Sequence, residues 1–243
     1  MGESSQIWVC IEIPSMNYHE ARELQLALVE ARCDGDYPYD VVLLLQHPPV
    51  FTLGRRGERK HLMVSEHFLN ERGVALLHVE RGGDITYHGP GQLVGYFIVD
   101  MKANRRKVVD FIEALEEVMI RTARDWGVKA ARNPLNRGVW VGPAKLGSLG
   151  IAIRQGVSFH GFALNVNNSL EPFQWIHPCG LTDTSMTSMK GVLGSELPME
   201  AVLQATKTHI RDVFRVELEP RTIQDLGSIL GKSHSGHLSS EGL

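Results

Sequence analysis

The alternation of apolar and polar positions predicts the main elements of this chain. Residues 6–13 alternate and are rich in β-branched and aromatic side chains, which predicts a strand. Residues 17–32 and 107–126 carry apolar side chains at helical spacing, the second as a stripe from Val108 to Trp126 that stops at Gly127. Shorter apolar runs predict strands near 41–45, 75–80, 93–100, 137–141, 149–153 and 157–166, and a last helix from about Ser195 to Phe214.

The order of these elements predicts one domain. Strands outnumber helices and do not alternate regularly with them, which favours a single α+β domain whose mixed or antiparallel β-sheet is flanked by helices. No linker or internal repeat divides the chain. We place the domain at residues 1–220. Residues 221–243, rich in Ser, Gly and His from about Gly227, are expected to form a mobile C-terminal tail.

Composition narrows the class of protein. The chain has 243 residues, of which 43% are hydrophobic and 22% charged, as in ordinary globular proteins. A formal net charge of -3 gives no bulk attraction to nucleic acid or to a membrane surface. No run approaches the roughly 20 apolar residues of a membrane span, and the first residues do not resemble a signal peptide. We therefore expect a cytoplasmic protein with neither nucleic acid nor membrane as a partner.

The three cysteines differ in their surroundings. An odd count without repeated spacing argues against a disulfide framework and suits a reducing compartment. Cys10 lies in an alternating strand and is expected to be a packed apolar residue. Cys33 precedes Asp34 and Asp36, whose charges oppose a thiolate. Cys179 lies in a turn-prone His-Pro-Cys-Gly sequence, and this context leaves both an inert turn residue and a nucleophile open.

Three further segments combine glycines with polar side chains. Residues 81–92 place Arg, Asp, Thr, Tyr, His and Gln among four glycines. Residues 142–151 surround Lys145 with small residues, so Lys145 is either a surface side chain or a cation held near a reacting group. The spacing of glycines and lysine in residues 142–151 does not match a phosphate-binding loop. His160, in the third segment, suits a core position equally well.

No metal or cofactor is expected from these patterns. His88, His160, His177 and Cys179 do not show the close spacing of known metal sites.

Taken together, four segments resemble the lipoyl(octanoyl) transferase family. They are RGGDITYHGPGQLVGY at 81–96, GPAKLGSLGIAI at 142–153, FHGFALNV at 159–166 and HPCGLTDTSMTSM at 177–189. Their order matches the family, and the resemblance extends from about residue 7 to about residue 215. It implies the fold of the biotin/lipoyl protein ligase catalytic domain. It also implies transfer of an octanoyl group from acyl carrier protein to a lysine of a lipoyl domain. Such domains occur in 2-oxoacid dehydrogenase complexes and in the glycine cleavage H protein.

The resemblance also implies roles for single residues. Cys179 would carry the acyl group as a thioester, and Lys145 would lower the pKa of its thiol. The acyl chain would lie against walls that include Ile85, Leu149 and Phe162. The substrate-binding residues implied are Arg81, Gly82, Gly83, Asp84, Ile85, Thr86, Tyr87, His88, Ser148, Leu149, Gly150, His160, Gly161 and Phe162.

The implied chemistry is physically adequate. Transfer between two thioesters is close to isoenergetic, so no ATP is needed. An ordinary cysteine has a pKa of about 8.5 and is only a few per cent ionised at pH 7. A lysine ammonium about 4 Å away contributes roughly 4 kcal/mol at an effective dielectric constant near 20, or about three pKa units before desolvation. His88 is a second candidate to take the proton of the incoming lysine, unless it only orients the site.

Several alternatives stay open from sequence. An ATP-dependent lipoate or biotin ligase of the same fold would not need Cys179, and a non-catalytic acyl-binding module would need neither Cys179 nor Lys145. An amidotransferase that moves octanoyl groups between carrier domains would also use a cysteine. Two basic runs, Arg55–Arg56 with Arg59–Lys60 and Arg105–Lys107, are either a docking surface for an acidic carrier protein or a solvated surface.

Overall fold

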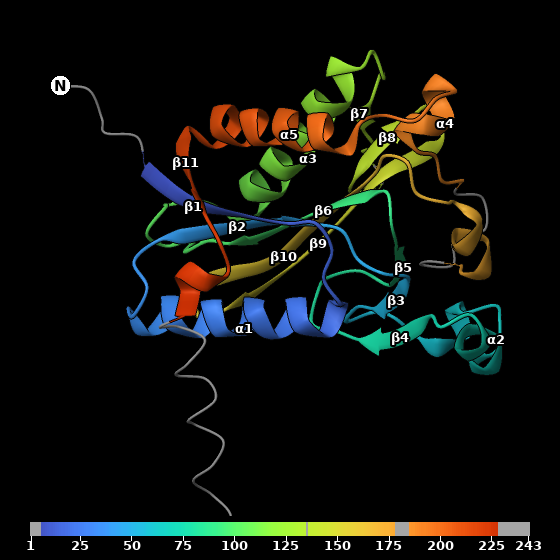
Figure 1. Ribbon diagram of the computed structural model, residues 1–243, viewed down its shortest axis with the longest axis horizontal. Helices are drawn as coiled ribbons and strands as arrows, with labels where there is room; N and C mark the ends of the chain where they lie inside the picture. The colour runs from blue at the N-terminus through green and yellow to red at the C-terminus, as the bar shows by residue number, and fades with distance from the viewer. Residues whose placement is uncertain (1–5, 135, 178–184, 228–243) are drawn as a thin grey trace, which may run out of the picture.

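The computed structural model describes residues 6–134, 136–177 and 185–227. A large mixed β-sheet runs through the molecule with helices on both faces, and a small second sheet lies at one end (Figure 1). This arrangement confirms the α+β class expected from the sequence.

The large sheet has eight strands. β1 is parallel to both of its neighbours, and every other pair is antiparallel, so the sheet is mixed. In spatial order the strands are β11 (Val216–Arg221), β1 (Gln6–Ile13), β2 (Asp40–Leu45), β6 (Gln92–Ile98), β10 (Val157–Asn165), β9 (Ala144–Arg154), β8 (Val139–Val141) and β7 (Ala131–Arg132).

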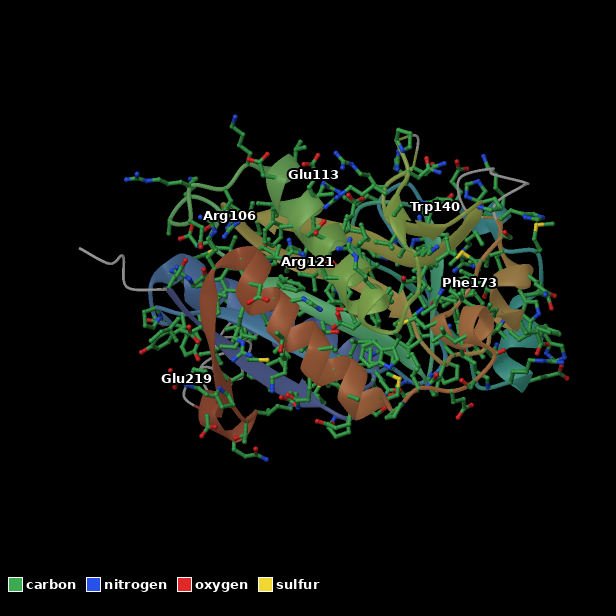
Figure 2. All side chains as sticks on the ribbon, turned by 90° about the horizontal axis from the view of Figure 1, so that it is seen from above. Arg106, Glu113, Arg121, Trp140, Phe173 and Glu219 are labelled. Carbon is green, nitrogen blue, oxygen red and sulfur yellow. The ribbon has the colours of Figure 1, made fainter. Side chains whose placement is uncertain are left out.

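Three long helices cover this sheet. α1 (Tyr18–Asp34) lies on one face, and α3 (Val108–Asp125) and α5 (Met199–Phe214) pack together on the other (Figure 1). Figure 2 shows α5 and α3 from above. Leu115 and Met119 of the predicted stripe are fully buried. Val108 is 42% exposed, because the packed side of α3 begins one turn later, at Phe111.

The small sheet has three strands and supports one side of the site described below. β3 (Val50–Leu53) is its centre, with β4 (Ala75–His78) parallel on one side and β5 (Ile85–His88) antiparallel on the other. The remaining short elements are η1 (Arg59–His61), α2 (Glu66–Glu71), η2 (Glu171–Trp175), α4 (Met189–Leu193) and η4 (Gln224–Leu226).

The packed fold continues past the expected domain end at residue 220. Leu226 of η4 is fully buried in the core on the α1 side, beneath the partly buried Ile223. Residues 228–243 of the expected tail lie outside the described part of the chain. Among the helices that the structure describes, none has the length and apolar character to cross a membrane.

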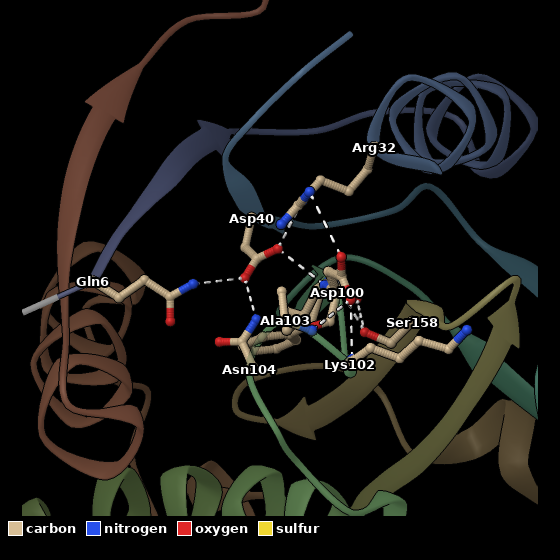
Figure 3. Close-up of polar contacts among 10 residues, drawn as sticks. Gln6, Arg32, Asp40, Asp100, Lys102, Ala103, Asn104 and Ser158 are labelled. Carbon is tan, nitrogen blue, oxygen red and sulfur yellow. Dashed lines mark hydrogen bonds and ion pairs between the residues drawn. The ribbon is translucent and has the colours of Figure 1, made fainter. Parts of the chain in front are cut away.

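A buried carboxylate joins the ends of several elements away from the site. Asp40, at the start of β2, accepts hydrogen bonds from Gln6, Arg32 and Asn104 and from the backbone N–H of Asp100 (Figure 3). Its distance to the Arg32 Nε is 3.1 Å. This cluster fixes the turn after β6 against the C-terminal end of α1.

Candidate active site

One cavity of about 470 Å³ lies where the small sheet meets the α1 face of the large sheet. Directly paired residues on neighbouring strands place side chains on the same face of a sheet. Val94, Ala163 and Ser148 are paired across β6, β10 and β9, so they share this face. The lining residues are Tyr18, Arg56, Arg81, Gly83, Asp84, Ile85, Thr86, His88, Val94, Tyr96, Asn136, Arg137, Trp140, Lys145, Ser148, Leu149, Gly150, His160, Gly161, Phe162, Ala163, Phe173, Ile176 and Met186.

The structure brings most of the predicted site residues to this cavity, including Lys145 and Ile85. Leu149 and Phe162 also border it, but their side chains pack in the core on the α3 and α5 face, because they alternate with Ser148 and Ala163 along their strands. The expectation that these two side chains form walls for the acyl chain is therefore wrong. Gly82 and Tyr87 do not line it. Tyr87 points to the opposite side of β5, where its ring packs against Phe51 and Phe173. Gly82 lies behind the wall, and its N–H donates to the Ile151 carbonyl at 3.0 Å.

Lys145 stands at the start of β9, beside the point where the described chain resumes. Its backbone N–H donates to the Ser185 carbonyl at 2.8 Å, and its carbonyl accepts from Thr187 at 2.9 Å. Its Nζ lies 5.5 Å from the centroid of the Trp140 ring. Cys179, the predicted nucleophile, falls outside the described residues. The segment before it ends at His177, whose N–H donates to the His61 carbonyl at 2.8 Å.

A buried carboxylate holds the loop against which Lys145 packs. Gly138 has φ +116°, and a Cβ at this position would lie 2.8 Å from the Lys145 Cε. The Gly138 N–H donates to the carboxylate of Glu116 at 2.8 Å. That carboxylate also faces Arg132 at 3.3 Å and Arg137 at 3.5 Å. Glu116 therefore fixes the rim of the cavity next to the Lys145 side chain.

Hydrogen bonds fix the tautomer of His88. The Gln92 amide nitrogen donates to the Tyr87 carbonyl and to Asn165, so the Gln92 oxygen is left to accept from His88 Nδ1 at 2.8 Å. Burial lowers the pKa of His88 well below its usual value, so the ring is neutral. Its Nε2 is consequently the acceptor. Asn165 in turn donates to the Thr187 carbonyl, which ties His88 to the segment beside Lys145.

A second buried histidine orients Tyr96. His47 Nδ1 lies 2.7 Å from the Met16 carbonyl, which can only accept, so Nδ1 carries the proton. Burial lowers the pKa of His47 to about 4. Its Nε2 is then an acceptor, and the Tyr96 hydroxyl donates to it at 2.7 Å. The Tyr96 hydroxyl proton is thus committed to His47 rather than to the cavity.

The neutral state of His47 predicts a pH dependence of stability. Between about pH 6.5 and 4 the unfolded chain takes up a proton at this position and the folded chain does not. The free energy of unfolding should therefore fall as pH falls through this window, by up to about 3 kcal/mol. Urea denaturation at several pH values should show a shallower fall in His47→Gln. His88 and His160 act in the same direction, so the difference between the two proteins isolates His47. Equal slopes would contradict this assignment.

His160 occupies an unusual backbone position. Its φ is +58°, in the left-handed region, and its N–H donates to the Gln25 side chain at 2.8 Å. Its Nε2 lies 3.8 Å from the Glu80 carboxylate, which also binds Arg22. His160 and Arg22 hold the pKa of Glu80 well below its usual range, while burial lowers the pKa of His160. His160 therefore contributes a neutral ring to the cavity.

Arg81 holds the wall opposite the large sheet. Its buried guanidinium donates to the Thr52 carbonyl at 2.7 Å and to the Thr52 hydroxyl at 2.8 Å. Gly54 must be a glycine, because a Cβ there would lie 2.8 Å from the Arg81 guanidinium and 2.6 Å from the Gly83 carbonyl. These contacts lock the segment 81–84 onto β3.

The other two cysteines behave as the sequence predicts. Cys10 is buried, and burial raises its pKa to about 12. Burial and then the nearby Asp34 raise the pKa of Cys33. Within residues 6–134, 136–177 and 185–227, no group of three His, Cys, Asp or Glu side chains is arranged to hold a metal ion.

Comparison with known proteins finds one family model and several octanoyltransferases that resemble this chain. Residues 17–211 match the family described as "Lipoyl protein ligase A/B catalytic domain". An octanoyltransferase of Desulfotalea psychrophila is 46% identical over 84% of this chain and 92% of its own length. One from Caldicellulosiruptor bescii is 44% identical over 85% and 92%.

Solved structures support the fold. A lipoate-protein ligase A bound with ATP superposes with a TM-score of 0.71 over 98% of this chain and 97% of its own, at 16% identity. A bi-partite lipoate protein ligase from Thermoplasma acidophilum gives 0.69 over 98% and 95%, at 15% identity. At these identities the likeness concerns the fold.

Proposed function

Since this chain belongs to the lipoyl protein ligase A/B catalytic domain family, with close relatives that are octanoyltransferases, we propose that it transfers an octanoyl group to a lysine of a lipoyl domain. One observation carries the proposal: Lys145 lines a cavity whose walls include the apolar side chains of Val94 and Ala163 on the α1 face of the large sheet. The protein is then an acyltransferase that acts in protein lipoylation. Octanoyl-acyl carrier protein is the proposed donor, and lipoyl domains of 2-oxoacid dehydrogenase complexes and the glycine cleavage H protein are the proposed acceptors.

The proposed first step joins the acyl group to Cys179. The thiolate of Cys179 attacks the thioester carbonyl of the donor, an enzyme thioester forms, and the bond to the carrier sulfur breaks. Lys145 supplies positive charge for the thiolate and gives a proton to the departing carrier thiolate. Support comes from the residues that follow segment 178–184, because Ser185 and Thr187 are hydrogen-bonded to the backbone of Lys145.

The second step passes the acyl group to nitrogen. The amine of the acceptor lysine attacks the enzyme thioester, an amide forms, and Cys179 leaves as a thiolate. Lys145, having lost its proton in the first step, is the proposed base that takes the proton of the attacking amine. His88 is neutral and its Nε2 can accept a hydrogen bond, which suits it to orient a donor group in the cavity.

The test is intact mass measurement after mixing the protein with octanoyl-acyl carrier protein in the absence of ATP. We expect one octanoyl adduct that hydroxylamine removes and that Cys179→Ala lacks. An unmodified wild-type protein would overturn the cysteine mechanism. A requirement for ATP would favour a ligase that activates the acid as an adenylate. Transfer from an octanoylated carrier domain rather than from the acyl carrier protein would favour an amidotransferase.

The two basic runs differ in their surroundings, and this difference favours one of them for docking of the carrier protein. Arg55 and Arg56 are exposed, and Arg56 lines the cavity. In the other run, Arg106 is half-buried and donates to the Phe214 carbonyl at 2.8 Å, so it serves to join α3 to α5. We therefore assign docking of the acidic carrier to the run that contains Arg56.

Charge reversal tests this docking surface. Arg56→Glu should slow enzyme acylation by roughly five- to tenfold at low salt and flatten its dependence on salt concentration. Lys107→Glu is the matched control, because it makes the same charge change at an exposed position outside the cavity lining. Acylation rates under second-order conditions at several salt concentrations measure both. Equal behaviour of the two variants would argue against docking at Arg56.

A further inference from the structure

The cavity is polar at the end away from Lys145. Tyr18, Tyr96 and His160 border this part, which we call the polar end. Tyr96 is paired through Gly161 with Gly150, five residues along β9 from Lys145. At about 3.3 Å per residue the polar end therefore lies roughly 16 Å from Lys145 along the strand.

Polar atoms at this end are buried without a partner at hydrogen-bond distance. Tyr18 is 4% exposed and His160 1%. Within the described residues, neither the Tyr18 hydroxyl nor the ring nitrogens of His160 have a partner at normal hydrogen-bond distance. The Tyr18 hydroxyl interacts only weakly with that of Tyr96, and His160 Nε2 lies 3.8 Å from the Glu80 carboxylate. The Tyr96 hydroxyl differs, because it donates to His47. Buried polar groups without protein partners bind water where a cavity offers room, and covering them with apolar atoms is unfavourable.

We propose that Tyr18 and His160 set the upper limit on the length of acyl chain that the cavity accepts. This inference rests on the proposed octanoyl transfer and adds a residue-level basis for its selectivity. An extended octanoyl chain spans about 9 Å, from seven C–C bonds of about 1.5 Å each. An acyl carbonyl held at the Lys145 ammonium adds up to about 6 Å for the lysine side chain, so the sum is comparable with the distance to the polar end. A longer chain pushes methylenes against Tyr18 and His160.

The two opposing effects are similar in size. In an apolar slot each added methylene improves affinity by about fourfold. Covering a polar group that has no other partner weakens affinity by roughly ten- to a hundredfold. The loss at one hydroxyl therefore cancels the gain from two or three methylenes. Affinity should rise with chain length up to about eight carbons and then stop rising.

Calorimetric binding of free octanoate, decanoate and dodecanoate tests the limit without any transfer step. The wild-type protein should bind dodecanoate no more tightly than octanoate. Tyr18→Phe should improve the affinity for dodecanoate relative to octanoate by about tenfold, with octanoate changed by less than about twofold. Tyr37→Phe is the matched control, because it makes the same change at a buried tyrosine outside the cavity lining, whose hydroxyl accepts a hydrogen bond from Arg221. It should leave the ratio as in the wild type.

Three outcomes would overturn the proposed length limit. An unchanged ratio in a folded Tyr18→Phe protein would overturn it, as would an equal shift in Tyr37→Phe or a wild-type protein that binds dodecanoate far better than octanoate. The mass measurement with octanoyl-acyl carrier protein reports separately on the proposed function. A protein that accepts no octanoyl group but shows the shifted binding ratio would disprove the transfer and keep the length limit.

Discussion

Lys145→Ala should slow acylation of the enzyme by at least about a hundredfold at pH 7 while the protein stays folded. A lysine ammonium near a thiol favours the thiolate by about three pKa units, so its loss leaves only a few per cent of the nucleophile ionised. Loss of the proton donor for the departing carrier thiolate adds a further factor. The backbone bonds of Lys145 to Ser185 and Thr187 do not involve the removed side chain, so the strand should persist.

Alkylation of Cys179 against pH is the direct readout. The pKa of this thiol should be higher in Lys145→Ala than in the wild type. Peptide mass analysis separates the alkylation of Cys179 from that of Cys33. Burial and the nearby Asp34 raise the pKa of Cys33, which slows its alkylation. Lys145→Arg is the matched control: it keeps the positive charge but cannot release a proton at neutral pH. It should retain easy alkylation yet transfer slowly. Identical alkylation profiles in the wild type and Lys145→Ala would remove Lys145 from the mechanism.

The elements that the sequence predicts well are those with long, regular patterns. α3 buries one continuous face, and β1 is a run of β-branched and aromatic residues buried on both faces at its centre, so the sequence locates both within two residues. The short strands β3 and β5 escape prediction because each has four residues and is stabilised by pairing with the other. The apolar pattern of β5 is also broken by polar residues that face the cavity, such as Thr86 and His88.

The site likewise contains residues that the sequence predicts and residues that it does not. Segments 81–88, 148–150 and 160–162 can be named from the sequence through the family resemblance, and all three border the cavity. The sequence does not predict that Tyr18 lines the cavity, because a tyrosine at the start of an amphipathic helix does not indicate that the fold brings it beside β10. Trp140 and Arg137 also join the cavity through packing of a distant loop. The sequence does indicate a buried partner for Gln92, because a glutamine at the start of an otherwise apolar strand needs one when it is buried.

The contact between Gly150 and Gly82 gives the last large prediction. A Cβ on Gly150 would lie 2.7 Å from the Gly82 carbonyl oxygen, a distance that real Cβ atoms do not adopt. Both partners are backbone, and the Gly82 N–H is bonded to Ile151 on the same strand, so neither can move alone. Gly150→Ala should therefore push segment 81–84 away from β9 and open the wall that Arg81 and Asp84 form.

We expect Gly150→Ala to lower kcat/KM for octanoyl transfer by about a hundredfold and the free energy of unfolding by about 1–3 kcal/mol, the usual cost of overpacking. Gly82→Ala tests the same contact from the other side. Its Cβ would meet the Ile151 carbonyl at 3.4 Å, an ordinary contact distance, so its loss of activity should stay within about threefold. Transfer kinetics and urea denaturation of both variants measure the difference. If Gly150→Ala transfers as well as Gly82→Ala, the wall can shift without cost, and the close approach of the two glycines does not shape the acyl site.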